Sequence, residues 1–229
     1  MINSFSKYQV ATAIAILFHV IGLVGILFFD RSFFIETTPL NLLLMFGLLI
    51  YTQDSPRKYF WLFMGLCIVI GIGIEIIGTK TGYLFGDYRY GTVLGPSVAG
   101  VPWIIGINWF IIVYCSGVSI HAILSKMIDR LQAESVGPKQ LLKTISIVVD
   151  GATLAVFFDW MMEPVAVKLG YWTWLGNGDI PLYNYICWLI VSILLLLLFQ
   201  KLPFPKKNKF AVHLFLIQIM FFLILRTLL

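Results

Sequence analysis

The sequence predicts an all-α, polytopic membrane protein: a bundle of about seven transmembrane helices. Hydrophobic residues make up 60% of the 229 residues and charged residues only 12%, which is about half the charged fraction of a soluble domain. The mean hydropathy is +0.94. The apolar residues form long runs, and the polar connections between them are too short to fold independently. We therefore expect a single integral membrane domain over residues 1–229.

Seven apolar runs approach the length of roughly 20 residues, within a range of about 17–25, that a helix needs to cross a bilayer. They lie near residues 8–29, 36–52, 59–79, 102–124, 141–163, 183–200 and 209–228. The second run is the weakest, because Thr37, Thr38 and Pro39 shorten it. Pro39 suits the first turn of a helix, where its missing N–H forms no intrahelical bond.

The basic residues set the expected orientation, because cytoplasmic loops are enriched in Lys and Arg. On the side of the N-terminus lie Lys7, Arg57, Lys58, Lys126, Arg130, Lys139, Lys143, Lys201, Lys206, Lys207 and Lys209. On the other side lie Arg31, Lys80, Arg89, Lys168 and Arg226. We expect the cytoplasmic membrane as the location, with the N-terminus in the cytoplasm and the C-terminus outside. The net charge of +5 belongs to these loops and indicates no nucleic-acid partner.

The connection from Thr79 to Val101 is too apolar and aromatic for a solvated loop. Irregular backbone at membrane depth must be buried in protein. We therefore expect a re-entrant or interfacial segment between the third and fourth helices.

Three acidic residues fall late in outward-running helices: Glu75 in the third, and Asp159 and Glu163 in the fifth. Ionisable residues inside a membrane are expensive and usually functional. Asn108 and Asn184, early in the fourth and sixth helices, fall at the same depth. The pattern predicts an acid layer in the outer half of the bilayer, beneath the aromatic connections.

Helical spacing indicates where these acids face. Gly71, Glu75 and Gly78 share one helix face, and glycines permit close helix approach, so Glu75 should face protein. Asp159 and Glu163 also share a face, and like charges at this spacing repel. In a dry site one of these two carboxyls is expected to hold its proton at neutral pH, and a protonated carboxyl can serve as a proton donor.

Two further interpretations concern the same region. Pro164 should end the fifth helix at the acid layer, because proline breaks helical hydrogen bonding. The alternative to a catalytic role is that the acids pair with Lys80, Arg89 or Lys168 as interfacial anchors.

Glu75 and Glu163 are each followed, at the same offsets, by Lys, Gly and Tyr. This echo suggests that helices three–four and five–six are degenerate parallel repeats, related by an axis along the membrane normal. His19 in the first helix has two open interpretations, as a packing residue or a catalytic one, with Asp150 as a candidate partner. The histidines and cysteines are scattered and show no metal-ligand spacing, so we expect neither a metal ion nor another cofactor.

Aromatic residues are denser above the acids than an interfacial belt requires. They are Tyr83, Tyr88, Tyr90, Trp103, Tyr171, Trp172 and Trp174. Aromatic faces stabilise cations, so an acid layer beneath aromatic walls suits a carbocation.

These motifs resemble the carotenoid-biosynthesis integral membrane family that contains the carotenoid 1,2-hydratases, including the bacterioruberin-pathway, gamma-carotene and lycopene hydratases. The matching stretches are G-I-E-I-I-G at 73–78, G-Y-L-F-G-D-Y-R-Y at 82–90, L-G-P at 94–96, V-P-W at 101–103, D-W-M-M-E-P-V-A at 159–166, G-Y-W-T-W at 170–174 and N-Y-I-C-W at 184–188. The resemblance covers the third to the sixth helix. Each motif alone is soft, and their order and spacing give the specificity.

The resemblance implies that water adds across the terminal C1=C2 bond of an acyclic (psi) carotenoid end, through a tertiary carbocation and without a cofactor. Asp159 or Glu163 would be the acid, and Glu75 its partner or the base for water. The residues expected to bind substrate or water are Asn108, Asn184, Tyr83, Tyr88, Trp103, Tyr171 and Trp172. The expected partners are a hydrophobic carotenoid from the bilayer, water, lipid and other enzymes of the carotenoid pathway.

Two alternatives stay open from the sequence. A carotenoid end-group cyclase, such as a lycopene cyclase, would use the same initial proton and exclude water. A non-enzymatic seven-helix transporter could use intramembrane acids as a proton relay, although these acids lie at one end of the bilayer rather than along a path. A retinal receptor is disfavoured, because no lysine lies between Phe210 and Leu225 to form a Schiff base.

Overall fold

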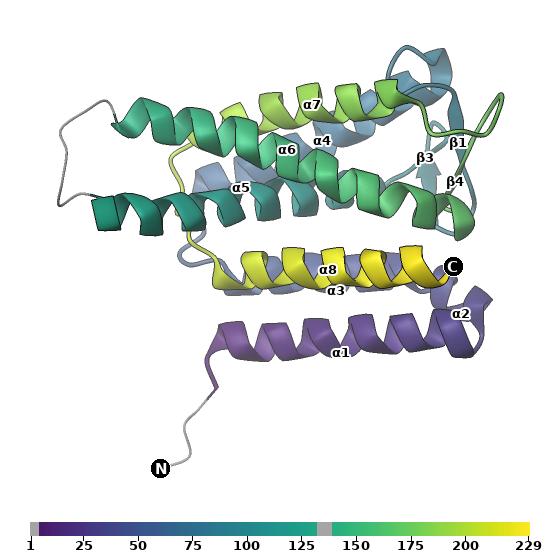
Figure 1. Cartoon of the computed structure of the whole chain (residues 1–229), viewed down its shortest axis with the longest axis horizontal. Coiled ribbons are helices and arrows are strands. Elements are labelled where there is room, and N and C mark those ends of the chain that lie inside the picture. The colour runs from purple at the N-terminus through teal and green to yellow at the C-terminus, as the bar shows by residue number, and fades with distance from the viewer. Residues whose placement is uncertain (1–4, 132–138) are drawn as a thin grey trace.

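A computed structural model of the chain describes residues 5–131 and 139–229 and shows an all-α bundle (Figure 1). Its helices are α1 (Lys7–Phe28), α2 (Arg31–Glu36), α3 (Thr38–Thr52), α4 (Lys58–Thr81), α5 (Ile104–Leu131), α6 (Lys139–Lys168), α7 (Leu182–Lys201) and α8 (Lys209–Leu228). Every predicted span corresponds to one helix, and the short α2 is additional. The polar connection between the fourth and fifth predicted spans falls on residues 132–138, outside the described residues.

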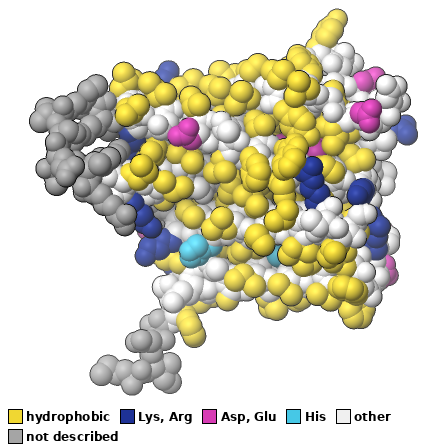
Figure 2. Space-filling view, viewed as in Figure 1, with side chains coloured by type: hydrophobic (Ala, Val, Ile, Leu, Met, Phe, Trp, Pro, Cys, Tyr) yellow, Lys and Arg dark blue, Asp and Glu magenta, His cyan; other side chains and the backbone are white. Residues whose placement is uncertain are grey.

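Within the described ranges, 6 helices are long and apolar enough to cross a membrane: α1 and α4 to α8. The 15 residues of α3 extend about 22 Å, less than the hydrocarbon core of about 30 Å. This agrees with the weakness of the second apolar run, and Pro39 lies in the first turn of α3 as predicted. In Figure 2 a hydrophobic band separates charged side chains that gather toward the two ends. The chain is therefore a multi-pass membrane protein.

Helix α5 lies at the centre of the bundle, with α3, α4, α6, α7 and α8 packed around it. Its residues from Trp109 to Cys115 are all buried. Gly106 lets α4 approach closely, because a Cβ atom there would lie 2.7 Å from the carbonyl oxygen of Ile68. Helix α1 lies at one edge of the bundle, against α8, α2 and α3 (Figure 1).

A cap of short strands covers the end of the bundle where α4 and α6 finish (Figure 1). Strand β1 (Tyr88–Tyr90) pairs antiparallel with β4 (Trp172–Trp174), and β2 (Ser97–Val98) pairs with β3 (Val101–Pro102). The aromatic connection between α4 and α5 therefore forms part of a cap at one end of the bundle, and the expected re-entrant or interfacial segment corresponds to this cap. The strands themselves were not predicted.

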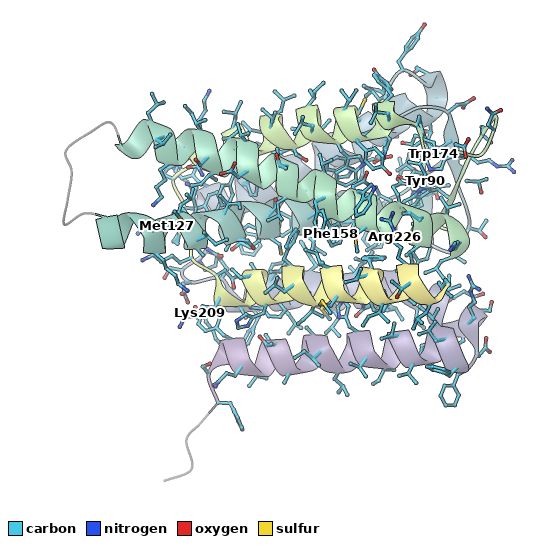
Figure 3. The ribbon with its side chains drawn as sticks, viewed as in Figure 1. Tyr90, Met127, Phe158, Trp174, Lys209 and Arg226 are labelled. Carbon is cyan, nitrogen blue, oxygen red and sulfur yellow. The ribbon has the colours of Figure 1, made fainter. Side chains whose placement is uncertain are left out.

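Pro164 does not end α6, contrary to the sequence-based prediction, because the helix continues to Lys168. A proline lacks the N–H that would bond to the carbonyl of Trp160. That carbonyl instead accepts a 2.6 Å hydrogen bond from Nη1 of Arg226 in α8. The guanidinium carbon of Arg226 also lies 3.9 Å from the centroid of the Trp160 ring, and Figure 3 shows Arg226 between α8 and α6. The neighbouring helix thus replaces the missing donor.

Candidate active site

A small buried chamber lies beneath the cap, where α4, α5, α6 and α7 meet strands β1 and β4. Its volume is about 30 Å³, which is enough for water, because a cavity needs at least about 10–15 Å³ to hold one molecule. Glu75, Asp159 and Glu163 all line it, and each side chain is buried. The three acids that the sequence placed at one depth therefore face one space.

Glu75 accepts hydrogen bonds from three donors. Its Oε2 accepts from the phenol of Tyr88 and, at 2.7 Å, from that of Tyr90, while Oε1 accepts from Nε1 of Trp109 at 2.9 Å. Gly71 makes room for this arrangement, because a Cβ atom there would lie 2.8 Å from the Trp109 side chain. The predicted role of the glycine stripe is confirmed: Glu75 faces protein and not lipid.

Glu163 is held in a similar way by the second strand of the cap. Its Oε2 accepts from Nε1 of Trp172 at 3.1 Å and from Nε1 of Trp174 at 3.0 Å. Because alternate residues of a strand project from the same face, the two tryptophans of β4 point down onto one carboxyl oxygen. Glu163 therefore has two donors where Glu75 has three.

Asp159 lies one helical turn before Glu163 and has a single donor. Nδ2 of Asn184 in α7 donates to Oδ2 of Asp159 at 2.8 Å. The other oxygen, Oδ1, is buried and has no hydrogen-bond partner among the described residues. An unpartnered buried oxygen is costly, and here it belongs to a group that lines the chamber together with two other carboxyl groups. Asp159 is thus the least compensated of the three acids.

Tyr88 and Tyr90 lie in strand β1, outside the membrane-spanning helices. Burial raises the pKa of Tyr90 well above its ordinary value, and the negative charge of Glu75 raises it further. The same two causes raise the pKa of Tyr88. Both phenols therefore keep their protons and serve as donors to Glu75.

The alternative of interfacial ion pairs is wrong for these acids. Among the described residues, the recorded ion pair joins Lys7 to Asp54 at the opposite end of the bundle, and Lys80, Arg89 and Lys168 pair with none of the three acids. In the same part of the chain, no group of three or more His, Cys, Asp or Glu side chains is arranged to hold a metal ion.

A second, larger cavity lies beside the chamber as a groove among α1, α2, α3, α5 and α8, with a volume of about 340 Å³. This is within the range of about 300–1,000 Å³ that is typical of small-molecule sites. Most of its lining is apolar, and it includes the exposed side chains of Phe18, Phe33 and Leu40. The groove therefore reaches the surface of the bundle.

The groove and the chamber share one wall. Ile105, Asn108, Met162 and Trp172 line both cavities. Met162 is the most adaptable of these, because its unbranched thioether side chain has three rotatable bonds. A long apolar ligand in the groove would thus meet the acid chamber at this wall.

The structure brings most of the predicted site residues to one place. The chamber is lined by Glu75, Tyr88, Asn108, Asp159, Glu163, Trp172 and Asn184. Tyr171 lines the groove, where its hydroxyl lies 2.7 Å from that of Thr38. Tyr83 and Trp103 line neither cavity. Tyr83 is 79% exposed, and its recorded hydrogen bonds come from its backbone: its N–H donates to Oγ1 of Thr81 at 3.1 Å and its carbonyl accepts from the Tyr183 hydroxyl at 2.8 Å.

Three residues that donate to the carboxyl groups were not among the predicted site residues: Tyr90, Trp109 and Trp174. The sequence placed Tyr90 and Trp174 in the aromatic cluster above the acids, and it indicated no role for Trp109 in the site. Tyr90 and Trp174 lie close together in the cap (Figure 3). Their local signal is the alternation Tyr-Arg-Tyr and Trp-Thr-Trp, which fits a strand with one aromatic face but is shorter than the run of about 4–8 residues over which alternation predicts a strand. Trp109 stacks on Trp188 of α7, with ring centroids 4.0 Å apart.

His19 and Asp150 do not form the pair that the sequence left open. Asp150 is exposed, whereas His19 is buried and its Nδ1 contacts the carbonyl oxygen of Ala15 at 2.8 Å.

Comparison with known proteins gives two matches. The family model for carotenoid biosynthesis proteins matches residues 37–229. The bisanhydrobacterioruberin hydratase of Haloarcula japonica is 29% identical over 131 residues, which are 56% of this chain and 40% of that relative. The match thus spans less than half the length of the curated relative. No solved structure matches the chain.

Proposed function

The chain belongs to the carotenoid biosynthesis protein family, and from this premise we propose that it is a carotenoid end-group hydratase. It adds water across the terminal C1=C2 bond of an acyclic carotenoid end. The observation that carries the proposal is a water-sized chamber with three carboxyl groups, set against an apolar groove of ligand size. The name of the matched relative supports an enzyme of this class.

The numbers of hydrogen-bond donors support different roles for the three acids. Donors stabilise the charged form of a carboxyl group, and Glu75 has three of them. Asp159 has one donor and an unpartnered oxygen. It also lies one helical turn from Glu163, and two carboxyl groups this close cannot be charged at the same time at low cost in a dry site. We assign Asp159 as the proton donor and Glu75 as a carboxylate that is charged before the reaction begins.

The groove supplies the place for the polyene. An acyclic carotenoid from the bilayer enters between the exposed side chains of Phe18 and Leu40. Its terminal double bond then lies at the wall that the groove shares with the chamber. Movement of the Met162 side chain opens this wall and brings C2 to the carboxyl group of Asp159.

The reaction proceeds in two steps that balance without a cofactor. Asp159 gives its proton to C2, so the C1=C2 π bond breaks, a C2–H bond forms and C1 becomes a tertiary cation. Water in the chamber then forms a C1–O bond and releases a proton. A carboxylate, Glu75 or Glu163, accepts that proton, which returns to Asp159. The net change is the gain of one water molecule.

Polar side chains would orient the water molecule of the second step, and aromatic side chains would stabilise the carbocation that it attacks. Asn108 lines both cavities and Asn184 donates a hydrogen bond to Asp159, which supports a role for both in orienting water. Trp172 and the stacked pair of Trp109 and Trp188 line the chamber. Aromatic faces of this kind attract a cation, and they would stabilise the positive charge on C1.

We further propose that the protein lies in the cytoplasmic membrane with the active chamber toward the outer face. The excess of Lys and Arg at the opposite end of the bundle supports this orientation.

The test is expression in cells that accumulate an acyclic carotenoid, in medium that contains water labelled with heavy oxygen. We expect a more polar pigment that has gained one water per reacted end, with the label in its hydroxyl group. The matched control is the Asp159→Asn variant, which should express and leave the pigment unchanged. An apolar product of unchanged mass would instead identify a cyclase. Unchanged pigment with confirmed expression of the wild-type protein would contradict the proposal.

A further inference from the structure

A basic cluster lies at the end of the bundle opposite the acid chamber, and the proposed reaction does not use it. Lysine side chains border the short connection between α7 and α8: Lys201, Lys206, Lys207 and Lys209. Figure 3 labels Lys209 at this end. Among the side chains that the structure describes, the recorded ion pair joins Lys7 to Asp54, and none of these four lysines has an acidic partner.

The backbone that carries these lysines is held firmly against the bundle. Phe204 is buried and stacks on Phe63 of α4, with ring centroids 5.5 Å apart. The carbonyl oxygen of Pro205 accepts a hydrogen bond from Nε2 of Gln53 at 2.8 Å. Asn208 is 3% exposed and caps the first turn of α8. The connection is therefore preorganised, and little conformational entropy is lost when it binds a ligand.

Lys206 is half-buried, and its charge is only partly compensated. Its Nζ donates to the carbonyl oxygens of Leu202 at 3.1 Å and Gln200 at 3.5 Å, which carry partial negative charge because they lie at the end of α7. An ammonium group has three donors, so one is left for a ligand. Burial lowers the pKa of Lys206, because its charged form loses solvation, and a bound anion would offset this loss.

Three lysines from two parts of the chain converge on one place. The charges of Lys143, Lys206 and Lys207 all act on the ring of His121 in α5, and no described acid acts on it with them. Nζ of Lys143, in α6, also donates to Oγ of Ser125 in α5 at 3.1 Å. Like charges that are held close together repel one another. An anion with several acceptor oxygens would relieve this repulsion, and a phosphate group has this chemistry.

We propose that Lys143, Lys206 and Lys207 bind the phosphate group of an anionic phospholipid. The depth of the cluster identifies a lipid as the source of the phosphate, because the membrane-spanning part of α7 ends at Lys201 and that of α8 begins at Lys209. Phospholipid headgroups lie at this level of a bilayer, and basic pockets between transmembrane helices bind them. The acyl chains would lie along the hydrophobic band of the bundle (Figure 2). This site is independent of the proposed reaction.

The test compares two phospholipids on the full-length wild-type protein in a non-ionic detergent. Phosphatidylglycerol has a net negative charge and phosphatidylcholine has none, and native mass spectrometry at increasing lipid concentration measures the affinity for each. One lysine near an anionic headgroup contributes about fivefold to affinity, so three lysines predict a preference of roughly a hundredfold for phosphatidylglycerol. The preference should weaken as salt is added. Equal affinities would overturn the inference, and this measurement requires no variant to fold.

The exposed Lys207 offers a substitution that leaves the packing intact, and Lys58→Gln is its matched control. Lys58 lies at the same end of the bundle, at the start of α4, with its Nζ 5.0 Å from the centroid of the Tyr59 ring. Lys207→Gln should lower the affinity for phosphatidylglycerol about fivefold, and Lys58→Gln should leave it unchanged. Equal losses in the two variants would show a diffuse attraction to the whole basic end, and the site would be overturned.

A last measurement separates a lipid headgroup from free phosphate. Phosphatidylglycerol bound to the wild-type protein is challenged with millimolar inorganic phosphate, and with sodium chloride at the same ionic strength. Retention of the lipid in both solutions supports the proposal. Displacement by phosphate but not by chloride would show that the lysines bind the free anion, and the lipid assignment would be overturned.

Discussion

Two helix pairs build the chamber, and they treat their carboxyl groups differently. In the first, α4–β1–α5, three donors serve one carboxyl group, that of Glu75. In the second, α6–β4–α7, three donors serve two carboxyl groups, those of Asp159 and Glu163. Because donors stabilise the charged form, we propose that the first half holds the charge and the second half holds the proton.

The two halves share a plan beyond these donors. Helices α4 and α6 are each followed by a glycine with positive φ, Gly82 at 67° and Gly170 at 73°. Each then leads to a strand whose two aromatic side chains donate to Oε2 of the preceding glutamate. The antiparallel pairing of β1 with β4 is what a two-fold relation between the halves requires. Degenerate repeats would explain how one scaffold offers an acid opposite a base, and superposition of the halves, Glu75 on Glu163, stays a prediction.

The largest expected effect comes from removing the transferable proton. Asp159→Asn should lower turnover by about 10²–10⁴-fold, the usual contribution of a general acid. The protein should still fold, because the new amide oxygen can accept from Asn184. Asp150→Asn on the same helix is the control, since Asp150 is exposed, and it should keep wild-type turnover. Rates are measured by chromatography of the carotenoid product, and a near-normal rate in Asp159→Asn would remove the assignment.

The next prediction compares the two glutamates. Glu75→Gln and Glu163→Gln should both nearly abolish turnover, but only the first should destabilise the fold strongly. An amide at position 75 faces three donors and must place its own NH₂ against at least one of them, which costs about 1–3 kcal/mol. At position 163 the amide oxygen can still accept from Trp172 and Trp174. Thermal unfolding in detergent measures the difference, and equal losses would break the comparison.

The sequence was sufficient to predict the helices and the depth of the acidic residues in the membrane. The length and hydropathy of the apolar runs determine the helices, and the direction of each helix determines the depth of the residues near its end. It could not supply contacts between distant segments. Strands β1 and β4 have three residues each, too few for periodicity to register, and their pairing joins Tyr88 to Trp174 across the chain. The pairing decides which aromatics reach the acids, so Tyr90 lies in the site and Tyr83 does not.

Pro164 shows the same limit for a single residue. Its local rule, that proline ends a helix, depends on the carbonyl one turn earlier being left without a donor. Arg226 supplies that donor from α8, and the residues near Pro164 in the sequence do not predict this contact. The groove was also beyond prediction, because its lining comes from α1, α2, α3, α5 and α8 together.

A smaller effect should separate the equivalent cap residues Tyr90 and Trp174 (Figure 3). Tyr90→Phe removes a hydrogen bond to a charged carboxylate, worth about 1.5–3 kcal/mol, and turnover should fall at least about tenfold. Trp174→Phe removes a hydrogen bond to a carboxyl group that shares a proton, which is worth about 1 kcal/mol. Turnover should therefore fall less in Trp174→Phe than in Tyr90→Phe. Initial rates at saturating carotenoid decide the order. A larger loss in Trp174→Phe would place the fixed charge on Glu163 instead.

The smallest effect is a dependence of stability on alkaline pH. Burial and the charge of Glu75 raise the pKa of Tyr90 above that of an exposed tyrosine, which is about 10. The folded protein therefore keeps this proton at pH values where the unfolded chain loses it. The stabilisation is complete below pH of about 10 and declines as the pH rises further. Unfolding in detergent should show this decline, and Tyr90→Phe should make it shallower, while Tyr83→Phe, which removes an exposed phenol from the same cap, should leave it unchanged. If Tyr90→Phe leaves the decline as steep as in the wild type, the phenol is not held against a fixed charge, and the contrast between the two halves loses its electrostatic basis.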